Sequence, residues 1–225
     1  MYLETFQATQ SNVVDVTERV ALQVKPGVSE LEIADRLQSE LNDLGLTECW
    51  YPILICAGEH TGKPFSRRYH LPSSDVIVQA NDIIFVDSTP LRDTVWWNWS
   101  KTVAVGDDEF FHDLCASADE VAQLTFEFGN SSAHTIGELF DFCMQQIGKN
   151  GFVLLDYRND VGHSIFQVPA GQKVEDTPVE SRLFISDEYR HTPLKGILSI
   201  EPQVGKRHPG DGIMYGAKQQ RILIR

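Results

Sequence analysis

The 225-residue sequence predicts an α+β domain. Helical and strand patterns are mixed along the chain, without the regular strand–helix alternation of a doubly wound sheet. Apolar strand segments separated by short polar turns favour antiparallel hairpins. Because 42% of the residues are hydrophobic and no linker or charge block interrupts the chain, we expect a single domain over residues 1–225.

Four segments carry apolar residues at the spacing of an amphipathic helix, namely residues 3–24, 29–45, 109–128 and 136–149. The second and fourth begin with capping boxes, in which Ser29 is followed by Glu32 and Thr135 by Glu138. Gly45 is a typical residue for the end of the second helix.

Seven segments are typical of strands: "YPILICAG", "VIVQANDIIFVD", "TVWWNWSKTVAV", "GFVLLDY", "GHSIF", "GILSIEPQV" and "QRILIR". We expect residues 76–87 to form two short strands around a polar turn at residues 79–82. Residues 94–105 should hairpin back on the strand that ends at Asp87, through the turn at residues 88–93.

The formal net charge of −13 disfavours binding to nucleic acid or to an anionic membrane surface. No apolar run is long enough to span a bilayer, and the N-terminus lacks the pattern of a signal peptide. The four cysteines form no CxxC pair, which is typical of buried, reduced thiols in a cytoplasmic protein. We therefore expect a small molecule or a short peptide as the partner, and the sequence leaves a homodimer open.

Three ionisable side chains lie within apolar strand segments. Asp87 ends "IIFVD", His163 follows a glycine in "VGHSIF", and Glu201 interrupts "LSIEPQV" just before a proline. Each alone is more often structural, as a strand-end cap, a buried histidine or a partnered carboxylate. Burying a charge is costly unless it is paired or used, so three such residues together favour a functional site.

Asn98 is a fourth unusual residue, because it lies in "WWNWSKT" among three of the four tryptophans of the chain. A lone asparagine in such a place usually marks a turn or the tip of an edge strand. Its position relative to the three ionisable residues indicates a second explanation.

Six stretches carry this explanation in chain order: "VKPGVSELEIADRL", "HLPSSDVIVQANDIIFVDSTP", "WWNWSKT", "GHSI", "GILSIEPQV" and "YGAKQQRILI". Together they resemble the catalytic domain of the pita-bread superfamily, which includes methionine aminopeptidase, aminopeptidase P (prolidase) and creatinase. The resemblance covers nearly the whole chain. It implies a pita-bread fold, in which helices cover a curved antiparallel sheet.

The metal-dependent members of this superfamily hold two divalent metal ions with two aspartates, a histidine and two glutamates, whereas creatinase hydrolyses a C–N bond without metal. The resemblance places these five positions, in chain order, at Asp87, Asn98, His163, Glu201 and Gln220. Asn98 and Gln220 are therefore amides at positions where the family has bridging carboxylates. For the last position, a shift of one residue to Gln219 is the alternative.

Because hard divalent ions bind carboxylates far better than amide oxygens, we expect the two-metal site to be lost and no cofactor to be needed. One weakly held ion (Mn, Zn, Fe or Co) on Asp87, His163 and Glu201 is the alternative. Two further family positions also differ, since Ala170 falls where a second histidine would stand and Lys218 replaces an arginine.

We interpret the chain as a creatinase- or aminopeptidase-like enzyme that performs metal-independent acid/base chemistry, by C–N hydrolysis or elimination, on a small amino-acid-derived substrate. The predicted catalytic residues are His163, Glu201 and Asp87. The predicted substrate-binding residues are His70, Asn98, Gln220, Trp97 and Trp99. Two alternatives stay open, namely a metal-dependent aminopeptidase- or prolidase-like hydrolase and a non-catalytic peptide- or protein-binding relative.

Overall fold

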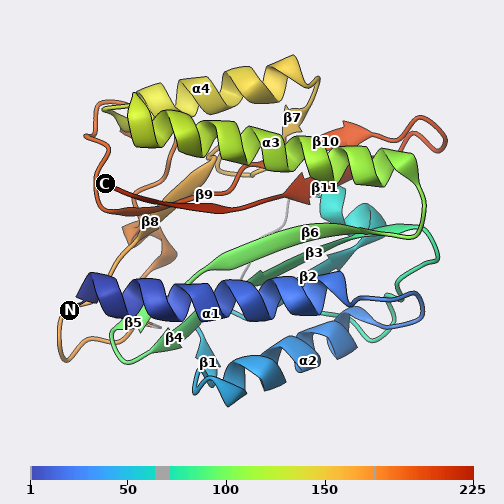
Figure 1. The fold of residues 1–225 in the computed structure, drawn as a ribbon, viewed down its shortest axis with the longest axis horizontal. Helices are drawn as coiled ribbons and strands as arrows, with labels where there is room; N and C mark the ends of the chain where they lie inside the picture. The colour runs from blue at the N-terminus through green and yellow to red at the C-terminus, as the bar shows by residue number, and fades with distance from the viewer. Residues whose placement is uncertain (1, 64–70, 175) are drawn as a thin grey trace.

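The protein has two halves, each built from two long helices and an antiparallel sheet (Figure 1). The computed structural model describes residues 2–63, 71–174 and 176–225. In the first half, α1 (Tyr2–Leu22) and α2 (Glu30–Asp43) lie on one side of the molecule. In the second half, α3 (Glu109–Ser131) and α4 (Ile136–Lys149) lie on the opposite side. Both sheets lie between the two helical layers.

Two three-stranded antiparallel sheets form the centre of the molecule. The sheet of the first half has the order β2 (Leu54–Ala57), β3 (Asp82–Ser88), β6 (Trp99–Val105). The sheet of the second half has the order β12 (Arg221–Ile224), β9 (Ile197–Ile200), β8 (Gly162–Ile165).

Two smaller antiparallel sheets extend this centre. One consists of β1 (Glu48–Cys49), β4 (Pro90–Arg92) and β5 (Val95–Trp96). The other consists of β7 (Val153–Leu154), β10 (Gln203–Arg207) and β11 (Met214–Lys218). Three short 3₁₀ turns, η1 (Gly58–Gly62), η2 (Val179–Ser181) and η3 (Asp187–Tyr189), lie in the connections.

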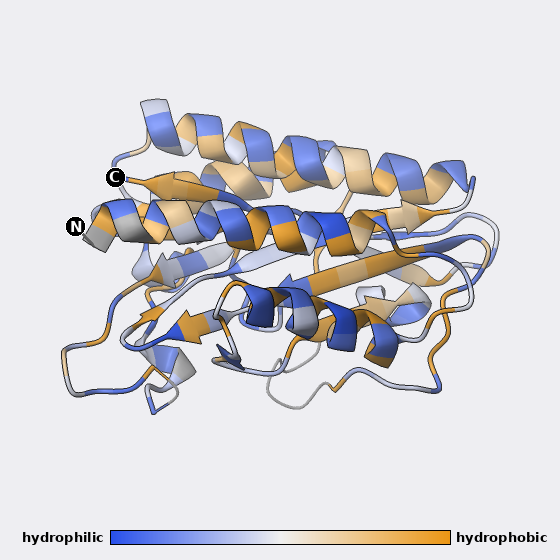
Figure 2. Cartoon of the chain, turned by 60° about the horizontal axis from the view of Figure 1, so that its bottom comes forward, coloured by the Kyte–Doolittle hydropathy of each residue, from blue (hydrophilic) through white to orange (hydrophobic). Residues whose placement is uncertain are grey.

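Each half has its own hydrophobic core. One cluster joins α1 and α2 to the β2–β3–β6 sheet, and the other joins α3 and α4 to the β8–β9–β12 sheet. Figure 2 shows hydrophobic and hydrophilic residues alternating around the long helices, as expected for helices with one buried face. The polar residues that lie between the two sheets are therefore enclosed by apolar layers on both sides.

Local sequence signals set the helix ends as expected. The Ser29 hydroxyl accepts a hydrogen bond from the backbone N–H of Glu32, whose carboxylate accepts one from the backbone N–H of Ser29. Thr135 and Glu138 form the same reciprocal pair at the start of α4. Both predicted capping boxes are confirmed, and Gly45 adopts the expected positive φ of 72° just after α2.

Three strand predictions were wrong in detail. Residues 76–78 form no strand but only an isolated bridge between Ile77 and Ser29, because they run beside the short loop that precedes α2. Residues 94–105 are divided into β5 and β6 at Trp97 and Asn98. Residues 196–204 are divided into β9 and β10, because Pro202 has no N–H to continue the ladder.

The α+β prediction itself is confirmed by these elements. Within the ranges that the structure describes, no helix combines the length and the apolar character needed to cross a membrane.

Candidate active site

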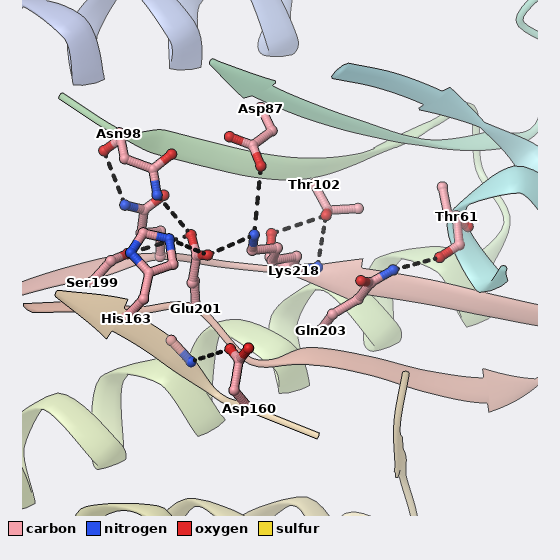
Figure 3. Close-up of polar contacts among 12 residues, drawn as sticks. Thr61, Asp87, Asn98, Thr102, Asp160, His163, Ser199, Glu201, Gln203 and Lys218 are labelled. Atoms are coloured by element: carbon pink, nitrogen blue, oxygen red, sulfur yellow. Dashed lines mark hydrogen bonds and ion pairs between the residues drawn. The ribbon is translucent and has the colours of Figure 1, made fainter. Parts of the chain in front are cut away.

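Five of the predicted site residues meet between the two central sheets. They come from β3 (Asp87), the β5–β6 break (Asn98), β8 (His163), the end of β9 (Glu201) and the β11–β12 connection (Gln220). Figure 3 shows the side chains of Asn98 and His163 facing Glu201, while a further residue, Lys218 at the end of β11, lies between Glu201 and Asp87.

Strand alternation decides which side chains of the first sheet face this centre. Asp87 pairs with Ser100 in the antiparallel register of β3 and β6, so the two side chains share one face. Two residues further along β6, the Thr102 hydroxyl donates to the carbonyl of Lys218 over 2.9 Å. The opposite face of β6 contacts α1, because Lys101 Nζ lies 3.7 Å from Glu18 Oε1.

A glycine before His163 allows β8 and β9 to approach closely. Gly162 has a φ of +148°, and a Cβ built there would lie 2.0 Å from the carbonyl oxygen of Ser199 on β9. Any larger residue would push the two strands apart. The glycine of the "GHSI" stretch therefore fixes the backbone from which His163 projects.

Gly162→Ala should lower the free energy of unfolding by at least about 3 kcal/mol, because the alanine is strained in both φ and packing. Urea denaturation of the purified variant measures this loss. Gly148→Ala is the matched control, because a Cβ there meets nothing within 4 Å. Equal stability of the two variants would contradict the close approach of β8 and β9.

Glu201 contacts its neighbours in the centre through both carboxylate oxygens. Its Oε1 lies 3.1 Å from His163 Nε2 and 3.0 Å from Lys218 Nζ. Its Oε2 accepts hydrogen bonds from Asn98 Nδ2 at 3.0 Å and from the Ser199 hydroxyl at 3.3 Å. Both carboxylate oxygens thus face donors, as a buried carboxylate requires.

Lys218 supplies a positive charge at the centre. Its Nζ lies 3.0 Å from Glu201 Oε1 and 3.5 Å from Asp87 Oδ2, and it stands 5.5 Å from the centre of the Phe85 ring. The residue is only 1% exposed. The sequence indicated Lys218 only as a replacement for an arginine, not as a site residue. A lysine directly before two glutamines at the end of an apolar strand was the signal available.

The two amides form hydrogen bonds as neutral groups. Gln220 Nε2 and Gln10 Nε2, the latter from α1, both donate to the backbone carbonyl of Asn98 over 2.9 Å. Gln219 Nε2 donates instead to the Thr102 carbonyl over 2.8 Å. The structure therefore places Gln220, rather than Gln219, beside Asn98. Gln10 had no motif to indicate it.

One tryptophan contacts the site, but it is not one of the two that the sequence assigned to substrate binding. The Trp96 ring lies 5.7 Å from the His163 ring. Trp97 stacks on Phe6 of α1 and donates its indole N–H to the Phe6 carbonyl. Trp99 pairs with Ser88 on the face of the sheet that contacts α1.

Trp97 and Trp99 thus lie toward α1, and their predicted role in substrate binding stays a prediction. The backbone break at residues 97–98 separates β5 from β6, so a simple alternation from one tryptophan to the next does not hold across it. The predicted substrate contact His70 lies outside the described residues.

Both ring nitrogens of His163 face oxygen atoms. Nε2 faces Glu201 Oε1, and Nδ1 lies 3.2 Å from the Ser164 carbonyl oxygen. In a neutral ring one nitrogen donates and the other accepts, so His163 can take a proton as well as give one.

The neighbouring cysteines are poor nucleophiles. Burial, with a smaller contribution from the negative charge of Asp87, raises the pKa of the Cys49 thiol to about 12. Burial likewise raises the pKa of Cys56 well above its usual value, with smaller contributions from Glu30 and Asp87. Both thiols therefore stay protonated at neutral pH, which excludes thiolate chemistry.

The sequence profile of metallopeptidase family M24 matches residues 4–219. The chain belongs to this family. Comparison with curated protein sequences gives no match. The family assignment confirms the resemblance to the pita-bread superfamily, and solved structures support the same fold.

Three of these structures illustrate the likeness of this M24 domain. An X-Pro aminopeptidase from Thermotoga maritima has a TM-score of 0.72 at 17% identity, over 99% of this chain and 58% of its own. The prolidase from Pyrococcus furiosus has a TM-score of 0.69 at 18% identity, over 96% and 58%. A methionine aminopeptidase from Thermotoga maritima has a TM-score of 0.70 at 18% identity, over 95% and 88%.

The M24 domain thus spans less than two-thirds of the X-Pro aminopeptidase and of the prolidase, but most of the methionine aminopeptidase. At these identities the likeness concerns the fold. The chemistry of this chain has to be inferred from its own side chains.

The residues of this M24 domain do not fit a pair of divalent metal ions. Asn98 and Gln220 are neutral amides, and the ammonium of Lys218 lies between the carboxylates of Asp87 and Glu201. In the described part of the chain, no group of three or more His, Cys, Asp or Glu side chains is arranged to hold a metal ion. Carboxylate-rich, anionic ligand sets are what such ions require.

Proposed function

We propose that this M24 domain is an aminopeptidase-like hydrolase that works without a divalent metal ion, on a small amino-acid-derived substrate in the cytoplasm. The observation that carries the proposal is the buried His163–Glu201 pair, with 3.1 Å between His163 Nε2 and Glu201 Oε1. An imidazole held by a carboxylate is a common acid/base unit in enzymes. Family membership supports hydrolysis of a C–N bond.

The acid/base step follows from this pair. In its neutral form, with one ring nitrogen unprotonated, His163 takes a proton from water as the water oxygen bonds to the substrate carbonyl carbon. It then returns the proton to the nitrogen as the C–N bond breaks. Glu201 holds the ring and stabilises its charged form, while Lys218 and Asn98 hold Glu201 in turn. Elimination would use the same pair, with His163 taking its first proton from a carbon atom of the substrate instead of from water.

A second candidate is a peptide- or protein-binding domain without turnover. It is favoured by the burial of the centre, since Asp87 is 0%, His163 1% and Glu201 4% exposed. A substrate has to displace part of these contacts to reach His163. A ligand that binds elsewhere on the fold does not.

Chelation separates the metal-independent hydrolase from its metal-dependent alternative. Protein purified without added metal should contain less than about one divalent ion per chain, since the two amides and Lys218 disfavour such ions. Turnover of amino-acid amides, dipeptides and ureido or guanidino compounds should be unchanged after EDTA treatment. Elemental analysis gives the metal content, and product analysis gives the turnover.

Two tightly held ions per chain, or turnover that EDTA abolishes and Mn²⁺ restores, would contradict metal independence. Binding of a peptide without any product would favour the binding domain.

A further inference from the structure

We propose that Lys218 is a built-in counter-ion, which takes the place of a divalent metal ion in this centre and keeps such an ion out. The inference deepens the proposed function, because it rests on the metal independence of the site. It does not depend on turnover, since it concerns the electrostatics of the centre.

The position of the ammonium group carries the inference. Lys218 Nζ lies 3.5 Å from Asp87 Oδ2 and 3.0 Å from Glu201 Oε1, so it bridges carboxylates from the two central sheets (Figure 3). All three residues are at least 96% buried. Two buried carboxylates need a compensating cation, and Lys218 provides one covalently attached to the chain.

One hydroxyl, that of Thr102, binds both backbone polar groups of Lys218. Its N–H donates to Thr102 Oγ1 over 2.8 Å, and its carbonyl accepts from the same hydroxyl over 2.9 Å. The ring of Phe85 lies beside the ammonium group. A surface lysine exchanges its partners freely, whereas this one is anchored at its backbone and enclosed at its tip.

The remaining groups oppose a second cation at the same place. Asn98 Nδ2 donates to Glu201 Oε2, so one oxygen of that carboxylate is already occupied by an N–H group. Because Asn98 and Gln220 bring no charge, a divalent ion beside Lys218 would add two positive charges without adding a negative one. Repulsion between cations a few ångströms apart in a buried site is strong.

Lys218→Met tests the inference through stability. The variant removes the charge but keeps most of the side-chain volume, and it leaves Asp87 and Glu201 without their buried cation. In EDTA its Tm should fall by about 6–20 °C. Saturating Mn²⁺ should then recover at least about 5 °C in the variant and shift the wild type by less than about 1 °C.

Lys101→Met is the matched control, because Lys101 also pairs with a carboxylate but at the partly exposed contact with α1. Its Tm should change little and should not respond to Mn²⁺. A Lys218→Met variant that is stable in EDTA, or a wild type that responds to Mn²⁺ as strongly as the variant does, would overturn the inference.

A second comparison holds even if Lys218→Met alone does not fold. Asn98→Asp and Gln220→Glu together restore the two carboxylates. This double variant is compared with a triple variant that also carries Lys218→Met and is purified in Mn²⁺. By titration calorimetry, Mn²⁺ should bind at least about 10-fold more tightly without Lys218. Equal affinities would overturn the inference. Lack of turnover in the wild type would instead count against the proposed hydrolase alone.

Discussion

His163→Ala should lower kcat by about 100- to 10,000-fold on any substrate that the wild type turns over, the usual contribution of a positioned acid or base. The variant removes the imidazole, the side-chain type best suited to take and give a proton in acid/base catalysis. Glu201 and Lys218 remain, but neither is free of the pairing that balances their charges. Steady-state kinetics on the wild type and the variant measure the loss.

The comparison needs a control for folding, because the His163 ring also contacts Trp96. Circular dichroism and a thermal melt of the variant should show a folded protein, with a lower Tm because Glu201 loses one of its buried partners. His191→Ala alters an exposed histidine on a surface turn and should leave kcat unchanged. Turnover that survives His163→Ala would refute the role of His163 even in an active enzyme.

Much of the fold could be predicted because its signals are local. The capping boxes at Ser29 and Thr135 need only residues three apart, and they set two helix starts correctly. The strand interruptions at residues 76–78 and 97–98 could not be predicted, since they depend on which backbone groups lie opposite in the folded chain. Pro202 was different, because its missing N–H is visible in the sequence.

The site could be predicted in part for a related reason. Asp87, His163 and Glu201 are ionisable residues in apolar strands, and this pattern alone indicates that they must meet partners. Lys218 and Gln10 could not be assigned, because the first depends on the distance between two sheets and the second on the docking of α1. Their roles are visible only in three dimensions.

Lys218 also changes how the two amides are understood. From the sequence, Asn98 and Gln220 indicate only that metal ligands have been lost. In the structure, the two neutral amides accompany the ammonium of Lys218, which lies between the two carboxylates that remain. We therefore interpret the two amides and Lys218 together, as parts of one centre whose positive charge comes from a lysine instead of metal ions.

Glu201→Leu should lower the free energy of unfolding by about 3–5 kcal/mol, the usual cost of removing one partner from a buried ion pair. The variant leaves Lys218 with only the more distant Asp87 carboxylate, at 3.5 Å, and leaves Asn98 Nδ2 without its acceptor. Glu201→Gln keeps one oxygen for these donors but loses the charge, so it should cost about half as much. Urea denaturation at neutral pH measures both losses.

Glu120→Gln on the exposed face of α3 serves as the control and should stay within about 0.5 kcal/mol of the wild type. If Glu201→Leu were as stable as this control, Glu201 could not be the residue that holds His163 and Lys218 in place.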